Sequence, residues 1–205
     1  MFPLGTVLFP HALLPLHVFE PRYRALVQHC MAGTPEFGVV LIERGSEVGG
    51  GDTRFHVGTL TEIVQAAELP DGRYVLMTAG RRRIRVEEWF DDDPYPTALV
   101  VSAVDVAGSG LSLTTGTELF ERVRRELRRV HALRSELGAP ARDVAELRFD
   151  PDPVRASFEA AGAAPLNPLD AQRLLELDDA GERLARLHAL LLDEAAVLEH
   201  RLAGS

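Results

Sequence analysis

Lysine is absent from this chain of 205 residues, because all 22 of its basic residues are arginine. Walker A ATPases place a lysine amine on nucleotide phosphates, and Ser-Lys proteases and Schiff-base enzymes use such an amine in their chemistry. Arginine is no substitute for it, since the planar guanidinium stays protonated. The sequence therefore excludes these three mechanisms.

Cysteine is nearly absent as well, with Cys30 as its single example. A lone cysteine cannot form an internal disulfide, so nothing in the sequence requires an oxidising compartment.

Charged residues are missing from positions 1–19, a length that must be tested as a signal peptide or a membrane-spanning helix. The stretch has no basic n-region, and its glycine, prolines and histidines disfavour a spanning helix. We expect a cytoplasmic protein with no membrane partner.

Positive charge is also in short supply, since the formal net charge is -9 and the isoelectric point is about 5.3. Nucleic-acid binding depends mainly on basic side chains that neutralise phosphates. The charge balance therefore argues against nucleic acid as the main partner. With 46% hydrophobic and 26% charged residues, the composition is that of a globular protein.

Residues 1–106 have the pattern of a β-rich domain. Prolines bound two short apolar runs, and Pro21 then stands where a helix can begin. Apolar spacing predicts that helix over residues 21–31. Alternation or apolar runs predict strands over residues 4–9, 13–19, 37–42, 55–64, 74–77, 84–89 and 98–104. Short strands with one intervening helix indicate a closed or half-closed β-barrel.

Residues 107–205 instead have helical spacing, which makes the predicted fold class α+β. A capping box at Thr115 and Glu118 predicts the first helix, and a second is expected between residues 153 and 161. Asn167 followed by proline begins a third, and a capping box at Asp179 begins a fourth. Four helices with short connections predict a small bundle. The leucine stripe that ends this last helix fits bundle packing or pairing with another copy, so we expect a monomer or a weak homodimer.

Common catalytic motifs are missing from the sequence: it has no Gly-x-Ser-x-Gly, His-Glu-x-x-His or Cys-x-x-Cys. His11, His17, His29 and Cys30 are the soft-ligand residues nearest to one another in the first half, and their spacings match no zinc motif. Residues 91–93 are three aspartates before a stiff Pro-Tyr-Pro turn, which predicts a charged turn rather than a calcium loop. We expect no metal, no cofactor and no enzymatic activity.

One basic run stands out, over residues 81–85. On a strand, alternation would place Arg81, Arg83 and Arg85 on one face. Two interpretations are open. The run pairs across a hairpin with Glu87, Glu88 and the aspartates at 91–93, or it faces an anionic ligand.

The opening of the chain resembles that of a known domain family. Residues 2–4, 8–10 and 14–23 read Phe-Pro-Leu, Leu-Phe-Pro and Leu-Pro-Leu-His-Val-Phe-Glu-Pro-Arg-Tyr. These segments resemble the LON substrate-binding domain, the N-terminal domain of Lon proteases. The resemblance continues at Gly58-Thr59, at residues 71–74 and 80–85, and in the helical half at residues 172–175 and 182–184. It implies a PUA-like β-barrel followed by a helical bundle.

In Lon, this domain recognises unfolded or tagged polypeptides before an ATPase passes them to a Ser-Lys protease. The present sequence has no lysine for either activity, so the resemblance implies a stand-alone, non-catalytic polypeptide-binding module. Such a module could act as an adaptor beside a separate protease. The PUA-like architecture and the basic run leave an RNA-binding module as an alternative, and a small-molecule-binding or enzymatic barrel is a further one.

A polypeptide-binding module needs an accessible apolar groove with a few polar anchors. The candidate substrate-binding residues are His17, Phe19, Glu20, Arg22 and Tyr23 at the strand-to-helix turn, together with Arg83 and Arg85. A structural interpretation of the same turn is also open. In it, Phe19 and Tyr23 belong to the core, while Glu20 and Arg22 stabilise the turn.

Overall fold

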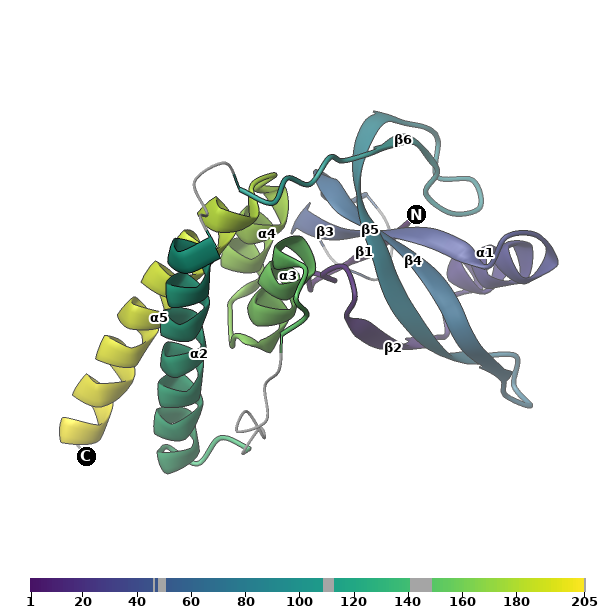
Figure 1. The fold of residues 1–205 in the computed structure, drawn as a ribbon. Coiled ribbons are helices and arrows are strands. Elements are labelled where there is room, and N and C mark those ends of the chain that lie inside the picture. The colour runs from purple at the N-terminus through teal and green to yellow at the C-terminus, as the bar shows by residue number, and fades with distance from the viewer. Residues whose placement is uncertain (46, 48–50, 109–112, 141–148, 205) are drawn as a thin grey trace. The chain divides into compact units, whose positions relative to one another are not determined.

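The computed structural model describes residues 1–45, 47, 51–108, 113–140 and 149–204, and for residues 113–117 the backbone alone. The chain divides into two compact units, Met1–Val104 and Asp105–Ser205 (Figure 1). The first unit contains the strands and one helix, and the second contains the remaining helices. Within the described ranges, no helix combines the length and the apolar character that crossing a membrane requires.

The first unit is a mixed sheet that curls into a half-barrel (Figure 1). Its strands are β1 (Phe2–Leu4), β2 (Leu13–Val18), β3 (Glu36–Arg44), β4 (Thr53–Glu68), β5 (Tyr74–Trp89) and β6 (Ala98–Ser102). The strand order is β1-β3-β4-β5-β2, and β6 pairs with the part of β5 that β2 leaves uncovered. β1 is parallel to β3, and the other pairs are antiparallel. The described strands form an open path, so the half-closed form of the predicted barrel is the one observed.

The strand predicted over residues 4–9 is wrong. β1 ends at Leu4, and the chain then bends at the exposed Gly5. Leu8 and Phe9 are buried in the core although neither belongs to a described strand. Apolar side chains in a short run can pack into a core without sheet pairing, and periodicity alone does not separate the two cases.

The strands predicted over residues 74–77 and 84–89 are parts of one strand, β5, which is 16 residues long. A bulge at Arg81 absorbs the irregular stretch between them, because Leu60 pairs with Arg82 while its neighbour on β4 pairs with Gly80. A second register shift lies near Val64 of β4. Bulges add local bend and twist to a paired strand, which explains how two long strands can curl the sheet.

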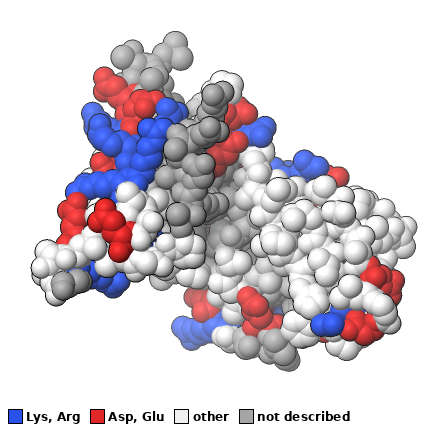
Figure 2. Space-filling view, turned by 90° about the horizontal axis from the view of Figure 1, so that it is seen from below, with Lys and Arg blue, Asp and Glu red and all other residues white. Residues whose placement is uncertain are grey.

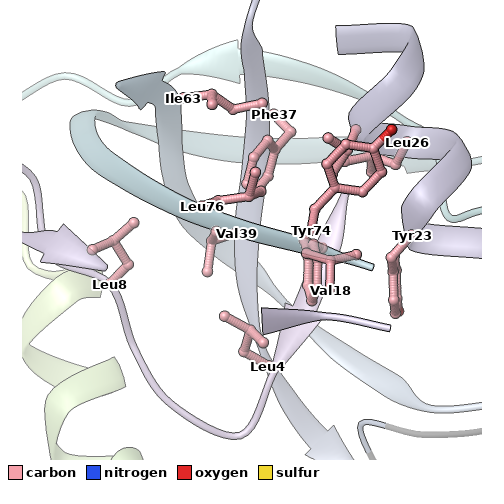
Figure 3. Close-up of a cluster of buried hydrophobic side chains, with 12 residues drawn as sticks. Leu4, Leu8, Val18, Tyr23, Leu26, Phe37, Val39, Ile63, Tyr74 and Leu76 are labelled. Atoms are coloured by element: carbon pink, nitrogen blue, oxygen red, sulfur yellow. The ribbon is translucent and has the colours of Figure 1, made fainter. Parts of the chain in front are cut away.

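Helix α1 (Pro21–Ala32) confirms the helix predicted after the second strand. Proline occupies the first turn, where its missing N–H costs no hydrogen bond. The helix buries Tyr23, Leu26 and Val27 against the concave side of the sheet. Figure 3 shows Tyr23 and Leu26 of the helix in one cluster with side chains of the strands, among them Phe37 and Leu76. This cluster is the core of the first unit.

The second unit contains α2 (Leu113–Glu136), α3 (Pro153–Ala163), α4 (Pro168–Glu176) and α5 (Ala180–Ala203). Two predicted caps are confirmed. The Asn167 side chain accepts a hydrogen bond from the backbone N–H of Asp170, and the Asp179 side chain accepts from two N–H groups of the first turn of α5. The cap predicted at Thr115 is wrong, since α2 already begins at Leu113 and places Thr115 inside its first turn.

The apolar stripes of α2 and α5 pack against each other within this unit. Val123, Leu127 and Val130 of α2 are fully buried, as are Leu184, Leu187 and Ala195 of α5. α3 packs on α5 as well. The predicted apolar stripe on α5 is buried within the unit at least as far as Leu198, which is only 3% exposed.

A fully buried arginine lies in the same unit. Arg183 of α5 places its guanidinium carbon 3.8 Å from the ring centre of Phe158. Its Nε donates to the carbonyl of Leu174 at 3.2 Å, and its Nη1 donates to Ser157 Oγ at 2.6 Å. Nη2 donates to Asp105 Oδ1 at 3.2 Å. Arg183 therefore connects three helices to the first residue of the unit.

The backbone makes a second connection at the same place. Val106 forms an isolated parallel bridge with Asp179. The N–H of Val106 donates to the carbonyl of Asp178 at 2.9 Å, and the N–H of Ala180 donates to the carbonyl of Val106 at 3.0 Å. The beginning of the second unit is thus held beside the first turn of α5.

Candidate functional site

A hollow of about 200 Å³ opens beside the turn that joins β2 to α1. β2 ends at Val18, Phe19 and Glu20 form the turn, and Pro21 begins the helix. Six of the ten lining residues are apolar, and the others include the carboxylates of Glu20 and Glu47. The lining residues are Phe2, Leu4, Pro15, Leu16, His17, Val18, Phe19, Glu20, Tyr23 and Glu47. Four of the seven candidate residues from the sequence therefore meet at one surface feature.

The two aromatic residues of the turn have different environments. Phe19 is 52% exposed, and its ring centre lies 6.5 Å from that of His17 in an edge-to-face arrangement. Tyr23 is only 3% exposed and stacks on Phe2 at 4.2 Å between ring centres. Tyr23 is thus a core residue, as the structural interpretation expected, whereas Phe19 presents an accessible ring at the hollow.

Arg22 stabilises the turn. Its Nε donates to Glu20 Oε2 at 3.1 Å, and its Nη2 donates to the carbonyl of Glu47 at 3.2 Å. The guanidinium carbon lies 4.4 Å from the ring centre of Tyr23, in the geometry of a cation–π contact. Arg22 does not line the hollow, so its observed contacts are those of a clamp that fixes Glu20 at the edge of the hollow.

The hydroxyl of Tyr23 is buried and has no hydrogen-bond partner among the described residues. Burial raises the pKa of Tyr23 to about 12, although the nearby charge of Arg22 acts in the opposite direction. The group therefore stays protonated at neutral pH. A buried polar atom without a partner costs roughly 1–3 kcal/mol of folding free energy.

We therefore expect the change Tyr23→Phe to leave the first unit equally stable or to stabilise it by about 1 kcal/mol, because it removes an unpaired hydroxyl and keeps the stacked ring. Urea unfolding followed by circular dichroism measures this difference. A loss of stability above about 1 kcal/mol would show that the hydroxyl does have a partner in solution.

The basic run lies away from the hollow, and its arginines differ in burial. Arg83 is fully buried and donates from Nη2 to the carbonyl of Val104 at 2.7 Å, whereas Arg85 is exposed. Neither residue lines the hollow. Arg83 and Arg85 share a face of β5, as predicted, but the chain segment that follows β6 contacts Arg83 and leaves Arg85 exposed. An arginine in this position is a structural residue.

For Arg81 and Arg82, the predicted acidic partners are wrong. Arg81 pairs with Glu62 of β4, with Nε 2.6 Å from Glu62 Oε2, and Arg82 donates to Ser102 Oγ at 3.0 Å. The acidic turn at residues 91–93 pairs with an arginine outside the run: Arg54 Nη1 donates to Asp92 Oδ1 at 3.0 Å. Pairing in the folded sheet follows its register, which the order of residues along the chain does not reveal.

Arg54 forms a well-shielded ionic cluster in the first unit. Its side chain is 8% exposed, and its Nε lies 2.5 Å from Oδ2 of Asp52, whose side chain is 1% exposed. Its guanidinium carbon is 4.9 Å from the ring centre of Trp89. Burial alone would raise the pKa of Asp52, but hydrogen bonds and the charge of Arg54 outweigh it and lower the pKa below its ordinary value. The cluster joins the start of β4 to the turn after β5.

An apolar surface next to the hollow was not predicted from the sequence. Antiparallel register places Leu13 opposite Ala79, Pro15 opposite Met77 and His17 opposite Val75. These pairs share the outer face of the sheet, because the residues of β5 that alternate with them, Leu76 and Thr78, are buried. We call Leu13, Pro15, His17, Val75, Met77 and Ala79 the outer face. Leu13 is 66% exposed and Val75 45%.

The outer face is continuous with the hollow, because Pro15 and His17 belong to both. Figure 2 views the molecule from the side on which β2 lies in Figure 1, and it shows few charged side chains over much of the first unit. The sequence of β2 does contain a signal for this surface. Successive residues of a strand point to opposite sides of the sheet, and β2 has apolar residues on both sides. Contiguous exposed apolar areas are common at the interaction sites of proteins.

Within the described part of the chain, no group of three or more His, Cys, Asp or Glu side chains is arranged to hold a metal ion. His29 Nδ1 is hydrogen-bonded to the hydroxyl of Tyr95 at 2.7 Å, and the thiol of Cys30 donates to the carbonyl of Glu36 at 3.2 Å. These candidate ligands of the first half therefore have partners of their own.

Comparison with known proteins finds the same family over most of the chain. The family model of the ATP-dependent protease La (LON) substrate-binding domain matches residues 1–193. Lon protease 2 of Herpetosiphon aurantiacus is 29% identical over 198 residues, and Lon protease of Cytophaga hutchinsonii is 30% identical over 197 residues. These matches cover 96% and 95% of this chain but only 24% of either relative. The chain thus spans about a quarter of the length of these curated relatives.

Solved structures give the same picture. The Lon N-terminal domain protein from Xanthomonas campestris has a TM-score of 0.64 and 27% identity, with 92% of this chain and 95% of that chain covered. The N-terminal domain of Mycobacterium avium complex Lon protease has a TM-score of 0.59 and 18% identity, covering 95% of this chain and 96% of its own. The second comparison supports the fold alone.

Proposed function

The chain belongs to the ATP-dependent protease La (LON) substrate-binding domain family, and from that membership we propose that it is a non-catalytic module that binds unfolded or tagged polypeptides. The observation that carries the proposal is the exposed ring of Phe19 at a hollow that continues into the apolar outer face. Unfolded chains expose the apolar side chains that folded proteins bury. A surface of this kind selects them on that difference.

The geometry suggests how a chain would be held. An apolar side chain of the polypeptide would enter the hollow against Phe19 and Leu16, and neighbouring side chains would lie along Leu13 and Val75. Glu20, fixed by Arg22, would accept hydrogen bonds from the backbone or from a basic side chain of the polypeptide. Binding by many small apolar contacts tolerates sequence variation, as a recognition module for unfolded proteins requires.

The organisation of the chain is part of the same proposal. We assign residues 1–106 to a PUA-like LON domain and residues 107–205 to a helical bundle subdomain, a boundary two residues beyond the end of the first compact unit at Val104. The half-barrel of the first unit and the mutual packing of α2, α3 and α5 support this division. Binding would take place on the first unit. A separate protease would be the partner that receives the polypeptide.

Titration into a fluorescently labelled, permanently unfolded polypeptide tests the proposal by fluorescence anisotropy. We expect saturable binding to the unfolded chain and none to its folded form or to a short RNA. The change Phe19→Ala should weaken binding about tenfold or more, since it removes an exposed aromatic contact of the kind that dominates interfaces.

The matched control is Phe90→Ala. Phe90 is also about half exposed, at 49%, but it lies after β5 and does not line the hollow. Its replacement should leave the affinity unchanged, and both variants should unfold within about 0.5 kcal/mol of the parent because both rings are exposed. Equal binding of folded and unfolded polypeptide, or equal loss in the two variants, would refute the proposal.

A further inference from the structure

A second hollow, of about 360 Å³, lies in the helical unit between the α3–α4 connection and the middle of α5. Its lining residues are Pro165, Leu166, Asn167, Asp170, Leu190, Asp193, Glu194 and Val197. All of them belong to the second unit, so this hollow is separate from the candidate site at Phe19. Its volume is within the range of small binding pockets.

The apolar part of this hollow gives α5 a second apolar side. Leu187, Leu191 and Leu198 are buried and pack within the unit. Leu190 and Val197 lie seven residues apart on a different stripe, where Val197 remains 47% exposed. A helix that merely covers a core needs one apolar stripe. This second, partly exposed stripe gives α5 an apolar contact surface outside the core of the unit.

The charge of the lining points to the kind of partner. It contains three carboxylates, those of Asp170, Asp193 and Glu194, and no arginine. Asn167 Nδ2 donates to Asp170 Oδ2 at 2.7 Å, and Arg134 Nη1 lies 3.3 Å from Glu194 Oε1. No ion pair or side-chain hydrogen bond joins Asp193 to another described residue. An exposed carboxylate three residues from Leu190 and four from Val197 complements a basic group beside an apolar one.

We propose that this second hollow docks a basic amphipathic segment of another protein. A large apolar side chain of that segment would sit against Leu166, Leu190 and Val197, and a Lys or Arg on the same face would pair with Asp193. This is the helix-in-groove mode of recognition, in which apolar anchors give affinity and charge at the rim selects the partner. The first unit selects for apolar character, whereas this site selects for positive charge as well.

The test uses a labelled Leu/Lys peptide of about four helical turns and a Leu/Glu peptide of the same pattern, titrated with the full chain. The chain carries Phe19→Ala, so that binding at the first unit is weakened about tenfold. We expect saturable binding of the Leu/Lys peptide and none of the Leu/Glu peptide. Val197→Ser and Asp193→Arg should each weaken it about tenfold.

Two controls separate docking from general attraction to an acidic protein. Leu192→Ser changes an apolar residue of α5 that is 40% exposed and outside the lining, and Glu136→Arg makes the same charge change on α2. Both should leave the affinity unchanged. The proposal is overturned if neither peptide saturates, if the two peptides bind equally, or if the control variants weaken binding as much as their counterparts.

Discussion

Replacing Arg183 with leucine should lower the free energy of unfolding of the second unit by about 3–5 kcal/mol. Leucine would retain apolar packing near Phe158 but would supply none of the donors that Arg183 provides. The carbonyls of Leu174 and Leu177 and the carboxylate of Asp105 would each lose a partner in a region where the arginine is fully buried. Removing one member of a buried network is costly because the others remain there unpaired.

Arg186→Leu is the matched control, since Arg186 lies one turn further along α5 and is exposed. This change should alter stability by no more than about 0.5 kcal/mol. Urea unfolding of both variants, followed by helical circular dichroism, makes the comparison. If the two variants unfold at the same urea concentration, the network around Arg183 does not stabilise the unit.

The change Arg54→Met should destabilise the first unit by about 3 kcal/mol at neutral pH, because it leaves the shielded carboxylate of Asp52 without its base. The loss should depend on pH. In the parent protein the pKa of Asp52 is lowered on folding, so the pair stabilises the fold fully above the ordinary carboxyl pKa of about 3.9. That stabilisation disappears as the pH falls through the lowered pKa.

The free energy of unfolding should therefore be measured from pH 7 down to pH 3. The difference between the parent and Arg54→Met should shrink as Asp52 becomes protonated. Arg85→Met is the control, since Arg85 is an exposed arginine of the same sheet. The free energy of unfolding of this control should differ little from that of the parent, and the difference should not change with pH. A gap for Arg54→Met that stays constant across this range would mean that Asp52 does not titrate with folding.

Local signals in the sequence predicted the helices well. Pro21, Asn167 and Asp179 act on residues within one turn of themselves, so a short stretch of sequence contains all the information that places a helix start. The resemblance identified the family, which the family model confirms over residues 1–193. Strand boundaries were less certain, because the bulge at Arg81 joins two segments that read separately as strands.

The candidate site was only partly predictable, for reasons of register and turn geometry. Sequence spacing brought His17, Phe19, Glu20 and Tyr23 together, and all of them line the hollow. It could not tell which aromatic ring is exposed, because the direction of each ring depends on how the chain turns into α1. Arg83 was misjudged because its burial depends on a segment about twenty residues further along the chain.

The bridge between Val106 and Asp179 has a mechanical consequence for the proposed polypeptide-binding function. The chain leaves β6, enters the second unit and is fastened at once to the start of α5 by two backbone hydrogen bonds and by the Asp105–Arg183 pair. Tension applied through the first unit, as when a bound polypeptide is pulled, would load this fastening before it reached α2. Because Val106 is bonded to residues beside Asp179, the force would pass directly from residue 106 to α5. The helices α2, α3 and α4, which lie between these residues along the chain, would keep their packing until those bonds break.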